Sequence, residues 1–106
     1  MPDPNTPQIP VQITWDPVAQ KGVAPDIQVP ASNGVTQIKW TASADIASFT
    51  ITGLDWSEFS PAQSNGQNPF ISTDRNDNTN TYNYTINATH ADGRTSSHDP
   101  KIENGT

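Results

Sequence analysis

The stretch DRNDNTN, which starts at Asp74, carries the side chains best suited to hold a cation. Asp74, Asn76 and Asn78 have the spacing of the first, third and fifth ligands of a calcium-binding loop. Asp77 adds a second carboxylate. Thr79 stands where such a loop requires glycine, and its twelfth position lacks glutamate, so this is not an EF-hand. Because Asp and Asn are also common between strands, we expect an ordinary connection, with a calcium site of these four residues as the alternative.

The stretch HADGRTSSHDP contains both histidines of the chain, His90 and His98. Asp92-Gly93 favours a two-residue type I′ turn, and in the register that this turn imposes the two histidines lie on opposite faces of the hairpin. They could not then bind one ion. A three-residue loop would reverse the parity, and only in that case is His90 a candidate metal ligand. We expect the tip of a hairpin without a metal.

Two aromatic side chains, Trp56 and Phe59, follow a glycine in LDWSEF and lie outside the alternating patterns. Exposed aromatic rings could stack on sugars or anchor a protein partner. A small core with few aliphatic residues also needs its aromatic side chains. We expect Trp56 to close one end of the core, with partner binding by Trp56 and Phe59 as the alternative.

The composition excludes several functional classes. Nine Asp and two Glu against three Lys and two Arg leave no basic surface for nucleic acid. The absence of cysteine removes disulfides, thiolate metal sites and cysteine catalysis. No nucleophile elbow, phosphate loop or zinc-protease motif is present, and neighbouring residues of a strand such as SSHD point to opposite faces and cannot form a triad. We therefore predict a protein that is not an enzyme and needs no cofactor.

The first residues, MPDPN, lack the basic and apolar regions of a signal peptide. No apolar run approaches the ~18 residues of a membrane-spanning helix. We expect no membrane insertion, and the sequence leaves the compartment open.

A chain of 106 residues is expected to form one domain. We predict a flexible arm over residues 1–7, a domain over residues 8–103 and a frayed end over residues 104–106. β-Branched and aromatic residues alternate with polar ones, and ten Pro and six Gly interrupt the chain too often for long helices. About seven short strands in an antiparallel β-sandwich are expected, immunoglobulin-like or cupredoxin-like in topology. Residues 16–25 are predicted to form a loop.

Alternation also predicts which faces are buried. Six inward-facing residues are expected at the centre of the core: Ile38, Trp40, Phe49, Ile51, Tyr84 and Ile86. Pro10 marks an edge strand, which discourages edge pairing and favours a monomer or a weak dimer. Asn83, Thr85, Asn87 and Thr89 form the opposite, polar face of the clearest strand. Such polar faces and the loop tips are expected to contact a protein or a glycan.

The predicted hairpin register extends into the tail DPKIENGT. It places Asp99 opposite Ile86 on the core side, where a carboxylate requires hydrogen bonds from the backbone or from a Tyr hydroxyl. Pro100 removes a hydrogen-bond donor and should break the strand, after which Ile102 packs back onto the core.

The segment TYNYTINATHADG is similar to the penultimate strand and hairpin of bacterial immunoglobulin-like domains, including the polycystic-kidney-disease type. The wider pattern PDIQVP, IKW, FTI, PF, YNYTI, DG and DPKIENG, spread over most of residues 25–105, resembles a family of small single-domain bacterial proteins, the DP-EP proteins. The resemblance implies an immunoglobulin-like or cupredoxin-like sandwich and carries no established activity. A cupredoxin copper site would require a cysteine that this chain lacks.

Overall fold

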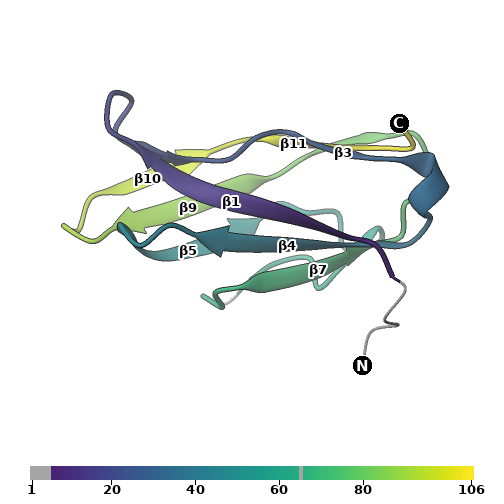
Figure 1. Ribbon diagram of the computed structural model, residues 1–106, viewed down its shortest axis with the longest axis horizontal. Coiled ribbons are helices and arrows are strands. Elements are labelled where there is room, and N and C mark those ends of the chain that lie inside the picture. The colour runs from purple at the N-terminus through teal and green to yellow at the C-terminus, as the bar shows by residue number, and fades with distance from the viewer. Residues whose placement is uncertain (1–5, 65) are drawn as a thin grey trace.

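The computed structural model describes residues 6–64 and 66–106 and is built almost entirely of strands (Figure 1). Within these residues there are eleven strands and one 3-10 turn, η1 (Ala31–Asn33). The strands are β1 (Gln8–Asp16), β2 (Lys21–Val23), β3 (Ile27–Val29), β4 (Thr36–Ala42), β5 (Ile46–Thr52), β6 (Phe59–Ser60), β7 (Phe70–Asp74), β8 (Thr81–Asn83), β9 (Thr85–His90), β10 (Thr95–His98) and β11 (Lys101–Asn104). The predicted all-β class is confirmed, with eleven strands in the described residues where about seven were expected. Residues 1–5 of the predicted arm lie outside the described residues.

The described chain contains no helix with the length and apolar character needed to span a bilayer.

The first sheet has the strand order β2-β1-β4-β7-β6. Within this sheet, β1 and β4 are parallel, and their pairing involves residues 8–13 of β1. The other three strand pairs are antiparallel. The expectation of a purely antiparallel structure is therefore wrong. Pro10 lies in the half of β1 that pairs only with β4, so its missing N–H costs no hydrogen bond on the free side, as predicted for an edge. β2 falls within residues 16–25, where the sequence predicted a loop.

The remaining strands form two smaller sheets, β10-β9-β5 and β3-β11-β8. These sheets share one long hairpin, because Ile86 pairs with His98 and Asn83 pairs with Lys101 in the same register. Between them, the backbone N–H of Tyr84 donates to the carbonyl of Pro100 at 3.2 Å. β3 adds to this hairpin in parallel with β11.

The tip of this hairpin differs from the predicted turn. The backbone N–H of His90 donates to the carbonyl of Arg94 at 2.7 Å, which leaves a three-residue loop, Ala91 to Gly93. Gly93 adopts a φ of 94°, a left-handed conformation that favours glycine. The odd loop length shifts the register by one residue, so His98 rather than Asp99 lies opposite Ile86.

The core lies between the first sheet and the long hairpin. All six residues predicted at its centre are at most 2% exposed: Ile38, Trp40, Phe49, Ile51, Tyr84 and Ile86. Trp40 of β4 reaches across to Tyr84, where the indole Nε1–H donates to the hydroxyl at 3.1 Å. This contact joins the two sides of the fold through a buried hydrogen bond.

The C-terminal residues are part of the structure. Ile102 is fully buried, as predicted, and Asn104, which was expected to belong to a frayed end, is a 3% exposed residue of β11. The backbone N–H of Thr106 donates to the carbonyl of Val29 at 3.2 Å. Asp99 is exposed, contrary to the predicted register, and accepts a hydrogen bond from the Thr85 hydroxyl at 2.8 Å. The predicted break at Asp99-Pro100 is confirmed between β10 and β11.

Candidate functional site

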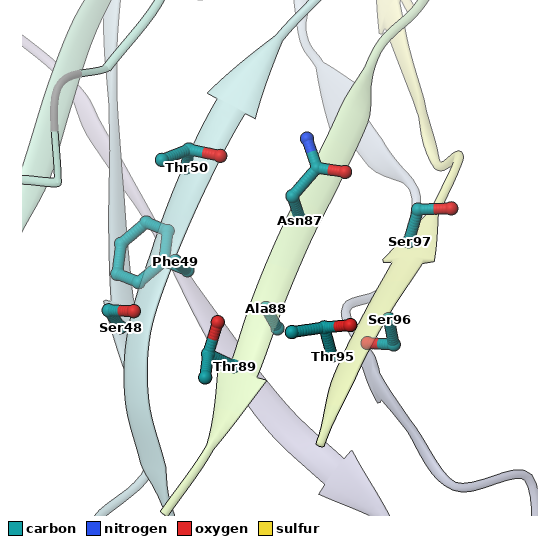
Figure 2. Close-up of a pocket in the computed structure, with 9 residues that line it drawn as sticks. All are labelled: Ser48, Phe49, Thr50, Asn87, Ala88, Thr89, Thr95, Ser96 and Ser97. Carbon is teal, nitrogen blue, oxygen red and sulfur yellow. The ribbon is translucent and has the colours of Figure 1, made fainter. Parts of the chain in front are cut away.

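The outward side chains of β5, β9 and β10 form a neutral polar surface, which we call the hydroxyl face. Strand register arranges them in two rows across the sheet, the first Ser48, Thr89 and Thr95, and the second Thr50, Asn87 and Ser97. Figure 2 shows Asn87 of β9 between Thr50 of β5 and Ser97 of β10. These side chains line a shallow hollow of ≈ 430 Å³.

The two-residue period of a strand produces this face. Phe49 and Ala88 alternate with the polar residues and point into the core, where they are 2% and 1% exposed. On β10, Ser96 likewise turns inward, and its Oγ accepts a hydrogen bond from the backbone N–H of Gly22 at 2.9 Å. The sequence predicted the polar side of β9, including Asn87 and Thr89. It did not identify the contributions of β5 and β10.

The hydroxyl face is chemically uniform. Each hydroxyl or amide on it both donates and accepts hydrogen bonds, and no charged side chain lines the hollow. In the part of the chain that the structure describes, none of the six side chains hydrogen-bonds to another group of the protein. Their hydrogen-bonding capacity is therefore available to a ligand.

His90 belongs to a packed group at the hairpin tip. Its ring lies against Trp15, with ring centroids 4.8 Å apart, and the backbone N–H of Asp92 donates to its Nδ1 at 3.1 Å. The Arg94 guanidinium covers the same indole at 5.3 Å and pairs with Asp92 at 2.7 Å. Hydrogen bonds and charge from Arg94, led by its backbone N–H, lower the pKa of Asp92. These contacts give His90 a structural role.

His98 lies on the same side of the hairpin as His90, because the three-residue loop reverses the predicted parity. Its Nε2 lies 3.1 Å from the carbonyl oxygen of Ala24, so the side chain contacts the segment between β2 and β3. Among the described residues, no three His, Asp or Glu side chains are grouped so that they could hold a metal ion. The two histidines thus belong to different contacts, His90 with Trp15 and His98 with Ala24.

The expectation that Trp56 closes one end of the core is wrong. Trp56 is 84% exposed and does not close the core, whereas Phe59 is 1% exposed and contacts Tyr82 edge-on, with ring centroids 5.2 Å apart. A turn separates the two aromatic residues, because Asp55 Oδ1 accepts from the backbone N–H of Ser57 at 2.8 Å and the carbonyl of Asp55 accepts from the N–H of Phe59 at 2.9 Å. Phe59 is therefore not a partner-binding residue, and Trp56 remains an available one.

The predicted calcium-loop residues do not act as one loop. Asp74 is fully buried, and its Oδ1 accepts from the backbone N–H of Asn76 at 2.9 Å. The Asn76 amide donates to two carbonyls of the β3–β4 connection, each at 2.9 Å, and accepts from the N–H of Gly105 at 3.0 Å. Asp77 is half exposed and pairs with Arg75 at 3.4 Å. Asn76 therefore links three chain segments, with both polar atoms of its side chain engaged in hydrogen bonds.

The other half of this region forms a buried group that we call the acid–amide cluster, made of Glu58, Asp74, Asn78 and Asn104. Asn104 Nδ2 lies 2.8 Å from Glu58 Oε2, 3.1 Å from Asp74 Oδ1 and 3.4 Å from Asn78 Oδ1. Burial raises the pKa of both carboxyl groups, and the neighbouring Asp77 raises that of Glu58 further. No sequence pattern pointed to Glu58 or Asn104, because they come from distant segments of the chain.

No protein-family model matches the chain, and comparisons with characterised proteins and with solved structures give no match.

Proposed function

We propose that this protein is a non-enzymatic binding module and that its hydroxyl face binds a neutral glycan. The observation that supports this is the set of six hydroxyl and amide side chains on three adjacent strands, none of which is used inside the described structure. A sugar presents hydroxyl groups that both donate and accept, and these side chains offer the same capacity.

The geometry of a sheet suits a ligand with repeated hydroxyl groups. Neighbouring strands lie about 4.8 Å apart, and residues two positions apart along one strand are about 6.7 Å apart. The face thus presents a two-dimensional array of hydrogen-bonding groups. Because the hollow is shallow and accessible to water, we expect weak binding with bridging water molecules.

The same surface gives no support to catalysis. None of the residues that line the hollow is an Asp, Glu, His or Lys, so it offers no group of the kind that usually serves as general acid or base. This favours binding without turnover.

We further infer that the chain is an immunoglobulin-like sandwich of the bacterial DP-EP kind. The contact between Trp40 and Tyr84 across the core and the terminal DPKIEN segment support this assignment. A single domain that is monomeric or weakly dimeric is part of the same proposal, and sedimentation over a hundredfold concentration range tests it.

Calorimetric titration with a panel of neutral oligosaccharides tests the proposed binding, using glucan, mannan and N-acetylglucosamine oligomers as probes. The variant Thr50→Val with Thr89→Val removes two hydroxyls and retains β-branched side chains. Each lost hydrogen bond should cost about 0.5–1.5 kcal/mol, which weakens binding roughly 5- to 150-fold in total. Thr14→Val changes an exposed threonine of β1, outside the hydroxyl face. It is the matched control and should bind as the parent does. Absence of binding to any oligosaccharide, or unchanged binding by the double variant, would refute the proposal.

A further inference from the structure

Glu58 and Asp74 are buried carboxyl groups without a cationic partner. They are 5% and 0% exposed. The nearest basic side chain in the sequence, Arg75, pairs with Asp77 and is itself 65% exposed. No other Lys, Arg or His in the described chain forms an ion pair with either carboxylate. Burial of ionised carboxylates without compensating positive charge is costly, so this site requires a further positive group or protons.

The oxygen atoms of the cluster converge on one point. Three acceptors, from Glu58, Asp74 and Asn78, lie within 2.8–3.4 Å of the single atom Asn104 Nδ2. Each of these oxygens also accepts from a second donor: Glu58 Oε2 from Asn78 Nδ2 at 3.0 Å, Asp74 Oδ1 from the backbone N–H of Asn76 at 2.9 Å and Asn78 Oδ1 from that of Asn80 at 3.0 Å. Three oxygens from separate segments are thereby held around one atom, and oxygen ligands drawn from separate segments suit a calcium ion.

Two further oxygens in the same cluster have no partner. Asp74 Oδ2 and Asn104 Oδ1 are both without a hydrogen bond, although their residues are only 0% and 3% exposed. Each unsatisfied buried acceptor is unfavourable, and both atoms belong to groups that already contact the cluster. A half-turn of the Asn104 amide exchanges its Oδ1 with its Nδ2 and would place a fourth oxygen beside the other three.

We propose that the acid–amide cluster binds a calcium ion through the carboxylates of Glu58 and Asp74 and the amide oxygens of Asn78 and Asn104. Only oxygen ligands are present, which suits a hard cation and disfavours zinc or copper. The mixture of carboxylates and amides from separate segments suits the flexible coordination of calcium better than the strict octahedron of magnesium. Asp77, which is 51% exposed, adds negative charge on the solvent side.

This proposal keeps Asp74 and Asn78 from the loop suggested by the sequence and replaces the other ligands. Glu58 enters from the turn before β6 and Asn104 from β11, 46 residues further along the chain. An ion bound here would connect the segment before β6, the end of β7 and β11. It would act at a site separate from the hydroxyl face, and its test does not depend on glycan binding.

Thermal unfolding of the full chain at pH 7 and constant ionic strength tests the calcium site, first in a chelator and then in increasing CaCl₂ or MgCl₂. Calcium should raise Tm by about 6 °C for each tenfold increase above its Kd, and magnesium should act more weakly. Asp74→Asn and Glu58→Gln should abolish this rise and melt at or above the metal-free Tm of the parent. Glu103→Gln, next to Asn104 on β11, is the matched control and should retain the response.

Terbium luminescence gives a second readout that requires no comparison of stabilities. Tyr82 can transfer excitation to a terbium ion in this site, since its hydroxyl lies 2.8 Å from Asn78 Nδ2. Terbium emission that calcium displaces, and that Asp74→Asn eliminates, is expected. A Tm that is independent of calcium would overturn the proposal, as would a response that survives in Asp74→Asn.

Discussion

Replacement of Tyr84 by Phe tests the buried hydrogen bond that joins the two sides of the core. The Tyr84 hydroxyl accepts from Trp40 Nε1 at 3.1 Å, and the two residues are 2% and 0% exposed. The substitution keeps the ring and removes only the oxygen, so the indole N–H is left buried without an acceptor. Such an unsatisfied donor costs about 1–3 kcal/mol of the free energy of unfolding.

The corresponding shift in Tm follows from the size of the chain. An unfolding entropy of about 2.1 cal/mol/K per residue, applied to 106 residues, converts 1 kcal/mol into about 4.5 °C. Tyr84→Phe should therefore melt about 5–13 °C below the parent at pH 7, measured by circular dichroism and checked by urea unfolding. In a double-mutant cycle with Trp40→Phe, the double variant should lose less than the sum of the two single losses, because both partners are then absent.

The same residue predicts a specific alkaline response. Burial raises the pKa of Tyr84 to about 12, above its usual 10.0. The folded state thus retains a proton that the unfolded state releases, so the free energy of unfolding should fall from about pH 10 to about pH 12. Tyr84→Phe should lose less stability over this range. An unchanged Tm for Tyr84→Phe, together with an additive cycle, would refute the assigned role of this hydrogen bond.

Three further substitutions or conditions test other parts of the fold. Gly22→Ala would place a Cβ 2.6 Å from the Cβ of Ala88, so urea unfolding should show a loss of about 1–3 kcal/mol, and Ala88→Gly in the same chain should recover part of it. Deletion of residues 99–106 removes β11, which pairs with strands on both sides, and circular dichroism should show an unfolded chain; a truncated protein with the parental Tm would contradict the pairing. In metal-free protein, the raised pKa of Asp74 should make stability fall as pH rises above about 3.8, and Asp74→Asn should flatten this fall in urea unfolding from pH 3 to pH 7, whereas parallel pH profiles would contradict the raised pKa.

Alternation in the sequence was sufficient to predict the buried side of the main strands. Phe49 and Ile51 on β5, and Tyr84 and Ile86 in the long hairpin, all face the core as expected. The signal is strong because each strand has one buried and one exposed face, so polarity changes at every residue. The same alternation predicted the polar side of β9, which became the centre of the hydroxyl face.

Pairing partners and loop details could not be obtained in this way. The parallel pairing of β1 with β4 joins residues such as Gln8 and Gln37, which are 29 positions apart, and alternation does not specify a partner. Asp92-Gly93 favours a two-residue turn by local preference, but the contacts of Arg94 with Trp15 accompany a three-residue loop. Tertiary packing thus overrode a local turn preference.

The exposure of Trp56 and the burial of Phe59 have a similar origin. Asp55 organises the turn through hydrogen bonds with Ser57, and these bonds lower the pKa of Asp55. A local turn of this kind rotates the chain between the two aromatic residues, and composition contains no information on which of them turns inward.

Mapping of backbone amide shifts by NMR during titration with a soluble neutral oligosaccharide tests the central claim most directly. We predict that shifts concentrate on β5, β9 and β10, at residues of the hydroxyl face such as Thr50, Asn87 and Ser97, and that they saturate together. Shifts that instead gather around Trp56 or the acid–amide cluster, or a spectrum that does not change, would contradict the assignment of this face as the binding surface.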